Sequence, residues 1–299
     1  RMTPMFSTFN AASVRGLGRG FISVVPLVWA SSGAVSSGAY SVGSSGTKTA
    51  ALLFGGYGGT YLARTEQFNG STWSSGGNMV MNSGNGISGP VGAGTSTSTF
   101  AVAGTNGPYF TYVDTYNGTS WSSTTAANSS HTSGMAAGTS ATSGLAATGY
   151  YSGFVNTSET FNGSSWTTQG NINALSRYHT SGCGTQTAAI YVGGGRDAAT
   201  TDVETFNGTS WTTTTSQPVA LRGQMTNGTQ TALSANGGYN ASSVYVNTTI
   251  IWDGSSWTSS ANLLAARGFG GNAGTQTSQM VCTGNTSAAS YVTSTETYG

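Results

Sequence analysis

Charged residues are scarce in this chain of 299 residues. They make up 6% of it, where roughly 25% is usual for globular domains. The formal net charge is +1, and Lys48 is the single lysine. Phosphate recognition needs clustered Lys and Arg, and anionic membrane surfaces attract polybasic segments. The composition therefore predicts a protein that binds neither nucleic acid nor a charged membrane surface.

Cysteine and histidine are also rare. The two cysteines, Cys183 and Cys282, fall in different repeats, and the two histidines are His131 and His179. Two cysteines are too few for a disulfide framework or a Cys-based zinc site, and a copper or zinc site needs clustered His or Cys. We therefore expect two free thiols, no metal site and no cofactor.

Long apolar runs are missing as well. The longest, residues 21–30, is half the length of a membrane-spanning helix and contains Pro26. The chain is therefore not expected to insert into a membrane. The run also has the length of a signal-peptide core, but the repeat described next assigns it to the fold.

Glycine contributes 46 residues and Ser and Thr are abundant, a bias that is typical of disorder. Against disorder, aromatic residues make up 11% of the chain and recur at fixed spacing. One motif reads aromatic, Asn-Gly or Asp-Gly, two hydroxyl residues, then Trp. Successive Trp residues of its five copies lie 48, 45, 45 and 46 residues apart: Trp73, Trp121, Trp166, Trp211 and Trp257.

The motif predicts a hairpin, because Asn-Gly and Asp-Gly tolerate the positive φ angles of a tight turn. A second element, Gly-Thr followed by an apolar strand-length run, has six copies. They begin at Gly46, Gly94, Gly138, Gly184, Gly228 and Gly274. Each unit thus holds four short strands in about 45 residues, which is the size of a propeller blade.

The sixth unit ends at Gly299 without a Trp strand, while Trp29 lies one repeat length before Trp73. We therefore predict an all-β, six-bladed β-propeller with four antiparallel strands per blade. Its last blade would be closed by an N-terminal strand from residues 21–30, placed beside 291–298. An open solenoid is the alternative, but it would need distinct caps rather than complementary half-repeats.

Two segments follow from this division. Residues 21–299 form the propeller, and residues 1–20 form an N-terminal arm. The arm is either a disordered leader or a docking segment that pairs with a neighbouring subunit of an assembly.

The few charges follow the repeat. Five acids lie three residues before the turn Asn or its equivalent, and Ile250 takes the sixth place: Glu66, Asp114, Glu159, Glu204 and Glu296. Four bases share another repeat position: His131, Arg177, Arg222 and Arg267. One interpretation pairs these bases with the acids inside the fold. The other makes them a half-ring at a channel mouth that binds an anionic sugar or a carboxylate.

Catalytic residues are not found. Glycoside hydrolysis needs paired carboxylates, and only Asp197, Asp202 and Asp253 lie outside the periodic acids. Asp253 is moreover a turn residue, and no nucleophile elbow of Gly-x-Ser-x-Gly type falls in a strand–helix context. We expect a protein that is not an enzyme, with a glycan-active enzyme as the weakest alternative.

The unit resembles the kelch repeat over roughly residues 23–299. In the fourth unit, the Arg, Gly-Gly, aromatic and Trp of that repeat correspond to Arg177, 193–194, Phe206 and Trp211. The repeat departs from the kelch pattern where Gly-Gly is lost, at 103–104, 148–149 and 283–284. The Asn-Gly-Thr-Ser-Trp style is similar to that of kelch-like propellers in structural proteins of tailed phages, particularly marine ones.

This resemblance implies a non-enzymatic protein at a virion surface: a tail fibre, spike or capsid decoration, oligomeric within an assembly. It would join other virion subunits through residues 1–20 and recognise host-surface glycans. The alternative is a secreted, extracellular bacterial adhesin or lectin.

Overall fold

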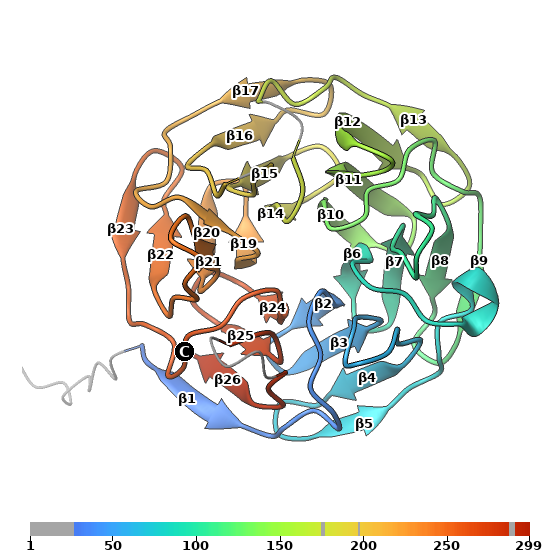
Figure 1. Ribbon diagram of the computed structural model, residues 1–299, viewed down its shortest axis with the longest axis horizontal. Coiled ribbons are helices and arrows are strands. Elements are labelled where there is room, and N and C mark those ends of the chain that lie inside the picture. Colours follow the sequence, from blue (N-terminus) through green and yellow to red (C-terminus); the bar gives the residue numbers. More distant parts are fainter. Residues whose placement is uncertain (1–26, 175–176, 197, 287–290) are drawn as a thin grey trace, which may run out of the picture.

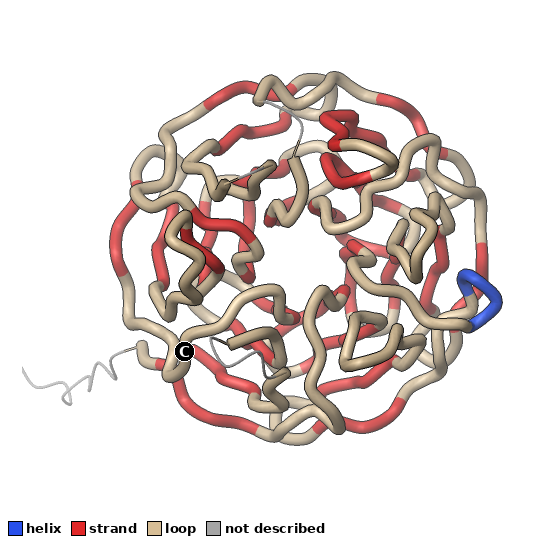
Figure 2. The backbone as a smooth tube through the Cα atoms, in the orientation of Figure 1, coloured by secondary structure: helices blue, strands red, loops and turns tan. Residues whose placement is uncertain are grey.

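The computed structural model describes residues 27–299 except 175–176, 197 and 287–290. These residues form six four-stranded antiparallel sheets in a ring around a central channel (Figure 1). The predicted six-bladed β-propeller is therefore confirmed. Figure 2 shows a ring of strands and loops, with the short 3-10 helix η1 (Met81–Gly84) at its rim.

Each blade runs from an inner strand at the channel to an outer strand at the rim. Blades 1 and 2 comprise β2 (Gly43–Thr47), β3 (Ala50–Phe54), β4 (Thr65–Phe68), β5 (Trp73–Ser75), and β6 (Val91–Thr95), β7 (Ser98–Val102), β8 (Val113–Tyr116), β9 (Trp121–Ser123). Blades 3 and 4 comprise β10 (Met135–Ser140), β11 (Ser143–Tyr150), β12 (Phe154–Phe161), β13 (Trp166–Thr168), and β14 (Ser181–Gly184), β15 (Ala189–Val192), β16 (Val203–Phe206), β17 (Trp211–Thr213). Blade 5 comprises β19 (Met225–Thr229), β20 (Ala232–Asn236), β22 (Thr249–Trp252) and β23 (Trp257–Ser259), with a small added pair, β18 (Leu221–Arg222) and β21 (Tyr239–Asn240).

Blade 6 joins the two ends of the chain. It contains β24 (Gly271–Gly274), β25 (Gln279–Cys282), β26 (Thr295–Tyr298) and, from the N-terminal side, β1 (Trp29–Ser32). Strand β1 pairs antiparallel with β26, with Trp29 opposite Tyr298, and their ring centroids are 5.3 Å apart. The predicted closure is thus confirmed, with the strand starting at Trp29. The predicted segment 21–26 and the arm 1–20 lie outside the described residues.

The repeated turn between the third and fourth strands uses its Asn differently from the prediction. In blade 1 the loop spans four residues, and among them only Gly70 has a positive φ. The equivalent glycine of each repeated turn also has a positive φ, and none of these angles exceeds 101°. The Asn69 Oδ1 accepts hydrogen bonds from the backbone N–H groups of Ser71 and Thr72, at 3.0 and 2.9 Å. The same pattern recurs at Asn117, Asn162, Asn207 and Asp253. Asn is therefore selected as a side-chain acceptor, and Gly alone supplies the backbone freedom.

The six repeat Trp side chains tie each blade to the preceding one. The indole N–H of Trp211 in blade 4 donates to Ser158 Oγ of blade 3 at 3.1 Å. The indole N–H of each other repeat Trp likewise donates to an acceptor in the preceding blade or in the connection that leaves it: Trp29, Trp73, Trp121, Trp166 and Trp257. The buried apolar side chains of the described residues form six clusters, one at each junction between blades. The core is therefore a ring of interfaces, and Trp recurs because it provides both apolar area and a hydrogen-bond donor there.

Replacing Trp211 with Phe should destabilise the propeller by about 1–2 kcal/mol, because the hydrogen bond to Ser158 and part of the buried area are lost. Trp211 is buried, whereas Trp257 is only half-buried. Trp257→Phe is therefore a matched control that should cost less. Urea unfolding of both variants tests this. If both variants lose the same free energy of unfolding, the indoles do not stabilise the propeller through the buried junctions.

Candidate functional site

The channel wall is made of small side chains from the inner strands of all six blades. A cavity within the channel is lined by Gly, Ala, Ser, Thr, Asn and one Cys from β2, β6, β10, β14, β19 and β24. Both cysteines are free, as expected, and Cys183 lies in this wall. Burial raises the pKa of the Cys183 thiol, so it stays protonated. The wall is thus uncharged and polar.

One mouth of the channel is framed by a closed circle of backbone hydrogen bonds. A residue with a positive φ of 50–68° lies two positions before the start of each inner strand: Ser41, Gly89, Ser133, His179, Gly223 and Phe269. Each donates its N–H to the carbonyl of the equivalent residue in the preceding blade, at 2.6–2.9 Å. The bond from Ser41 to Phe269 completes the circle. We call these six residues the mouth ring. Only the closed propeller allows every member to donate and accept at once.

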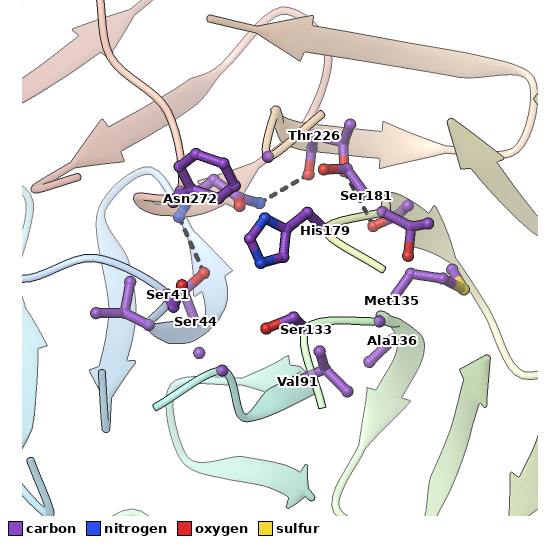
Figure 3. A pocket seen from close by; sticks show the side chains of 18 of the residues that line it. Ser41, Ser44, Val91, Ser133, Met135, Ala136, His179, Ser181, Thr226 and Asn272 are labelled. Atoms are coloured by element: carbon purple, nitrogen blue, oxygen red, sulfur yellow. Dashed lines mark hydrogen bonds between the residues drawn. The ribbon is translucent and has the colours of Figure 1, made fainter. Parts of the chain in front are cut away.

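The mouth ring surrounds a cavity of about 130 Å³. Its wall includes all six mouth-ring residues together with Met135, Thr226 and Asn272. Figure 3 shows the His179 imidazole projecting into this cavity between Ser133 and Asn272. Asn272 is fixed by hydrogen bonds to Ser44 Oγ (2.9 Å) and to the carbonyl of Thr226 (2.7 Å). The cavity is therefore concave, polar and held by strands, as ligand sites commonly are.

Aromatic side chains gather around the mouth. One arc contains Tyr40, Tyr57, Tyr61 and Tyr291, whose ring centroids lie 5.3–6.3 Å apart in successive pairs. A second arc contains Tyr109, Tyr150, Phe154 and Tyr178. A third contains Tyr239 and Tyr245, which contact Phe269. We call these ten side chains the aromatic crown.

The three arcs form one circle around the mouth. His179 joins the second arc to the third, because its ring contacts both Tyr178 and Phe269, at 4.1 and 4.7 Å between centroids. Burial raises the pKa of Tyr109, and the nearby Tyr150, Tyr178 and Tyr61 add to that shift. Burial, together with Tyr291, Tyr57, Tyr61 and Tyr245, likewise raises the pKa of Tyr40. These hydroxyls therefore stay neutral at physiological pH.

Three of the four bases predicted to line the mouth lie inside the blades. Arg267 is 1% exposed and its Nη2 is 2.6 Å from Glu296 Oε1. His131 is fully buried, with Nε2 3.2 Å from Glu159. Arg177 is buried and pairs with Asp202 at 2.5 Å. These positions support the interpretation in which the bases pair within the fold, and they remove three members from the proposed anion-binding half-ring.

Arg222 does not share the repeat position of the other three. The mouth ring aligns Leu221, not Arg222, with Arg177 and Arg267, because Gly223 is the ring member of blade 5. Arg222 lies one residue closer to the mouth, and its Cζ is 5.0 Å from the centre of the Tyr239 ring. The assignment of Arg222 to the periodic base position is therefore corrected. A binding role stays a prediction for Arg222, the one of these four bases that lies over a crown ring.

The periodic acids fix the connections between blades. Each accepts hydrogen bonds from the segment that enters its blade, at the residue seven after the repeat Trp: Ser36, Val80, Asn128, Asn173 and Leu264. Blade 5 differs at every one of these points, since Ile250 replaces the acid and Pro218, which has no N–H, replaces the donor. Burial alone would raise the pKa of Glu159, but hydrogen bonds from His131, Asn128 and Ser129 lower it overall.

The sequence reasoning did not single out the crown or His179. The sequence did contain a repeated aromatic pattern. A Tyr comes directly after the Gly-Gly position in three units, at Tyr57, Tyr150 and Tyr239, and another aromatic residue follows it four to six residues later. That pattern does not by itself indicate that six blades point these rings toward one opening.

Two further searches concern metals and membranes. Among the residues that the structure describes, no group of three His, Cys, Asp or Glu side chains could hold a metal ion. In the same part of the chain, no helix has the length and apolar character needed to cross a membrane.

Comparison with known proteins supports the fold. No protein-family model and no curated protein matches this sequence. Among solved structures, the chain is similar to YjhT, with a TM-score of 0.73 and 13% sequence identity. The match covers 88% of this chain and 95% of YjhT. At this identity, the similarity concerns the propeller fold alone.

Proposed function

We propose that this chain is a non-enzymatic surface protein whose propeller binds uncharged glycans at the aromatic crown. The observation that carries the proposal is the circle of tyrosines around a polar, strand-held mouth. A tyrosine ring offers an apolar face and a hydroxyl, and a sugar ring offers an apolar C–H face and hydroxyl edges. Nine tyrosines and Phe154 around one opening match that chemistry.

Exposure and charge support this choice of ligand. Tyr61, Tyr109 and Tyr291 are 38%, 36% and 36% exposed, so their rings are accessible while they stay packed against neighbours. Two cations lie on rings of the crown: Arg196 over Phe154 at 5.3 Å, and Arg222 over Tyr239. Both rest on aromatic faces, a placement that cation–π attraction favours.

The setting that fits best is a virion surface, as a tail fibre, spike or capsid decoration built on kelch-like repeats. The repeat style and the near absence of charge support it, and residues 1–20 would dock to other subunits of an oligomeric assembly. A secreted bacterial adhesin or lectin is the second setting. Capsid or tail genes beside this gene would support the first, and a secretion signal upstream of Arg1 would favour the second.

Glycan binding can be tested on an array of neutral and acidic glycans with the full chain. We expect neutral glycans to bind, and the double variant Tyr61→Ala/Tyr109→Ala to weaken binding by about 10- to 100-fold, because each aromatic contact is worth about 1 kcal/mol. Tyr112→Ala is the matched control: Tyr112 is 43% exposed but stacks on Phe110 and lines a separate cavity with Val80 and Thr124.

The control should keep full affinity. Bound glycans should also be recovered chemically unchanged, since the proposal assigns the site no reaction. Equal losses for the double variant and for Tyr112→Ala, or an array bound only by acidic glycans, would rule out the crown as the binding surface.

A further inference from the structure

Two members of the mouth ring keep bulky side chains where the backbone favours glycine. Glycine fills the position at Gly89 and Gly223, but His179 and Phe269 adopt φ angles of 55° and 61°. A bulky residue with positive φ is strained, and such strain concentrates at functional sites. A Cβ on Gly223 would lie 2.2 Å from the Phe269 ring, so this ring leans over its neighbour in the mouth. The two side chains are held in place at a cost, which indicates a role for them.

His179 also has an unmet hydrogen-bonding group. Its Nδ1 is buried and has no hydrogen-bond partner among the residues that the structure describes. The ring is edge-on to Phe269 and Tyr178 and projects into the mouth cavity (Figure 3). A buried polar atom without a partner is unfavourable in a folded protein. Rotation of the imidazole about its Cβ–Cγ bond would turn this nitrogen toward the cavity, where a ligand hydroxyl would provide the missing partner.

The cavity favours an uncharged group. All six backbone N–H groups of the mouth ring are used within the ring, so they do not form a free cluster of donors for an anion. Burial, with a smaller contribution from Arg222, lowers the pKa of His179 to about 3, and the imidazole is therefore neutral at pH 7. A neutral imidazole presents one donor and one acceptor nitrogen, which suits a hydroxyl.

We propose that the mouth cavity is a subsite for one hydroxyl-bearing edge of a neutral pyranose, with a sugar hydroxyl hydrogen-bonded to Nδ1 of His179 and a C–H face against Phe269. This inference rests on glycan binding at the crown and adds a specific contact at its centre. The cavity, at about 130 Å³, admits part of one sugar residue, and the rest of the glycan would lie on the crown.

The test uses the full chain with its histidine rings labelled with ¹⁵N. Only His131 and His179 are present, so the spectrum contains two imidazoles. The probes are the methyl glycosides of glucose, mannose, galactose and N-acetylglucosamine. We expect at least one to shift the His179 nitrogens while His131, buried beside Glu159, stays unchanged. Binding should not vary between pH 5 and 8.

A paired substitution isolates the imidazole. His179→Gly and Asn82→Gly both place glycine at a positive φ, but Asn82 lies in η1 at the rim, so only the first removes the proposed contact. We expect His179→Gly to weaken pyranoside binding about ten-fold, as for the loss of one buried hydrogen bond, and Asn82→Gly to change it less than two-fold. Both variants should fold, since glycine relieves strain at these positions.

The outcomes separate the two proposals. Binding of a pyranoside or a glycan without any shift of the His179 nitrogens, or equal affinities of the two glycine variants, would overturn the subsite and leave the crown in place. If no pyranoside and no glycan binds, glycan binding at the crown fails and the subsite fails with it.

Discussion

Deleting residues 1–32 should open the propeller and lower its melting temperature on the order of 10 °C or more. The deletion removes β1, which supplies the fourth strand of blade 6, and with it Trp29, which is 4% exposed and donates to the carbonyl of Ala261 in blade 5. Loss of a buried Trp side chain alone costs about 3–5 kcal/mol. The deletion also exposes the edge of β26, which invites aggregation.

Deleting only residues 1–26 is the control, because this deletion keeps β1 and its pairing with β26. This shorter deletion should leave the melting temperature of the propeller nearly unchanged. A peptide of residues 27–36 added to the longer deletion should restore part of the lost stability by pairing with β26. If the two deletions melt at the same temperature, β1 does not hold the ring closed.

Replacing Arg267 with Leu should destabilise the protein by about 3–5 kcal/mol, because the Glu296 carboxylate would stay buried without its cation. The pair is nearly inaccessible, at 1% and 2% exposure of the side chains, with 2.6 Å between Arg267 Nη2 and Glu296 Oε1. Arg267 Nη1 also donates to the carbonyl of Ser294 at 2.9 Å. Glu296→Ile should cost a similar amount, since it leaves the guanidinium unpaired.

Blade 5 supplies the control for this prediction. There, Leu221, Ile250 and Pro218 occupy the places of Arg267, Glu296 and the amide donor Leu264. The double variant Arg267→Leu/Glu296→Ile should therefore be more stable than either single variant, and adding Leu264→Pro should recover more. Urea unfolding provides the double-mutant cycle. Strictly additive losses would show that the base and the acid are not coupled.

The sequence predicted elements whose signals are local. The Trp spacing and the six Gly-Thr starts indicated six blades, and the lone Trp29 indicated a split blade, because blade-sized repeats must close without a free edge. The turn Asn was identified correctly as a turn residue, but its side-chain role was visible only in the structure. The periodic acids were also apparent, although their hydrogen bonds to the blade connections were not.

The site required the ring itself. In the sequence, nothing distinguishes His131, Arg177 and Arg267 from cations at the surface. Only the packing between blades decided that they are buried and paired. Arg222 lies one residue out of phase with them, as the mouth ring shows.

By itself, the sequence determined the blade number, the strand order and the closure by β1, because each follows from repeats read along one chain. The tertiary structure alone decided where the blades converge. Residues as distant in the chain as Ser41, His179 and Phe269 become neighbours through a circle of backbone hydrogen bonds that exists only when all six blades are in place. The aromatic crown and the mouth cavity are products of that circle.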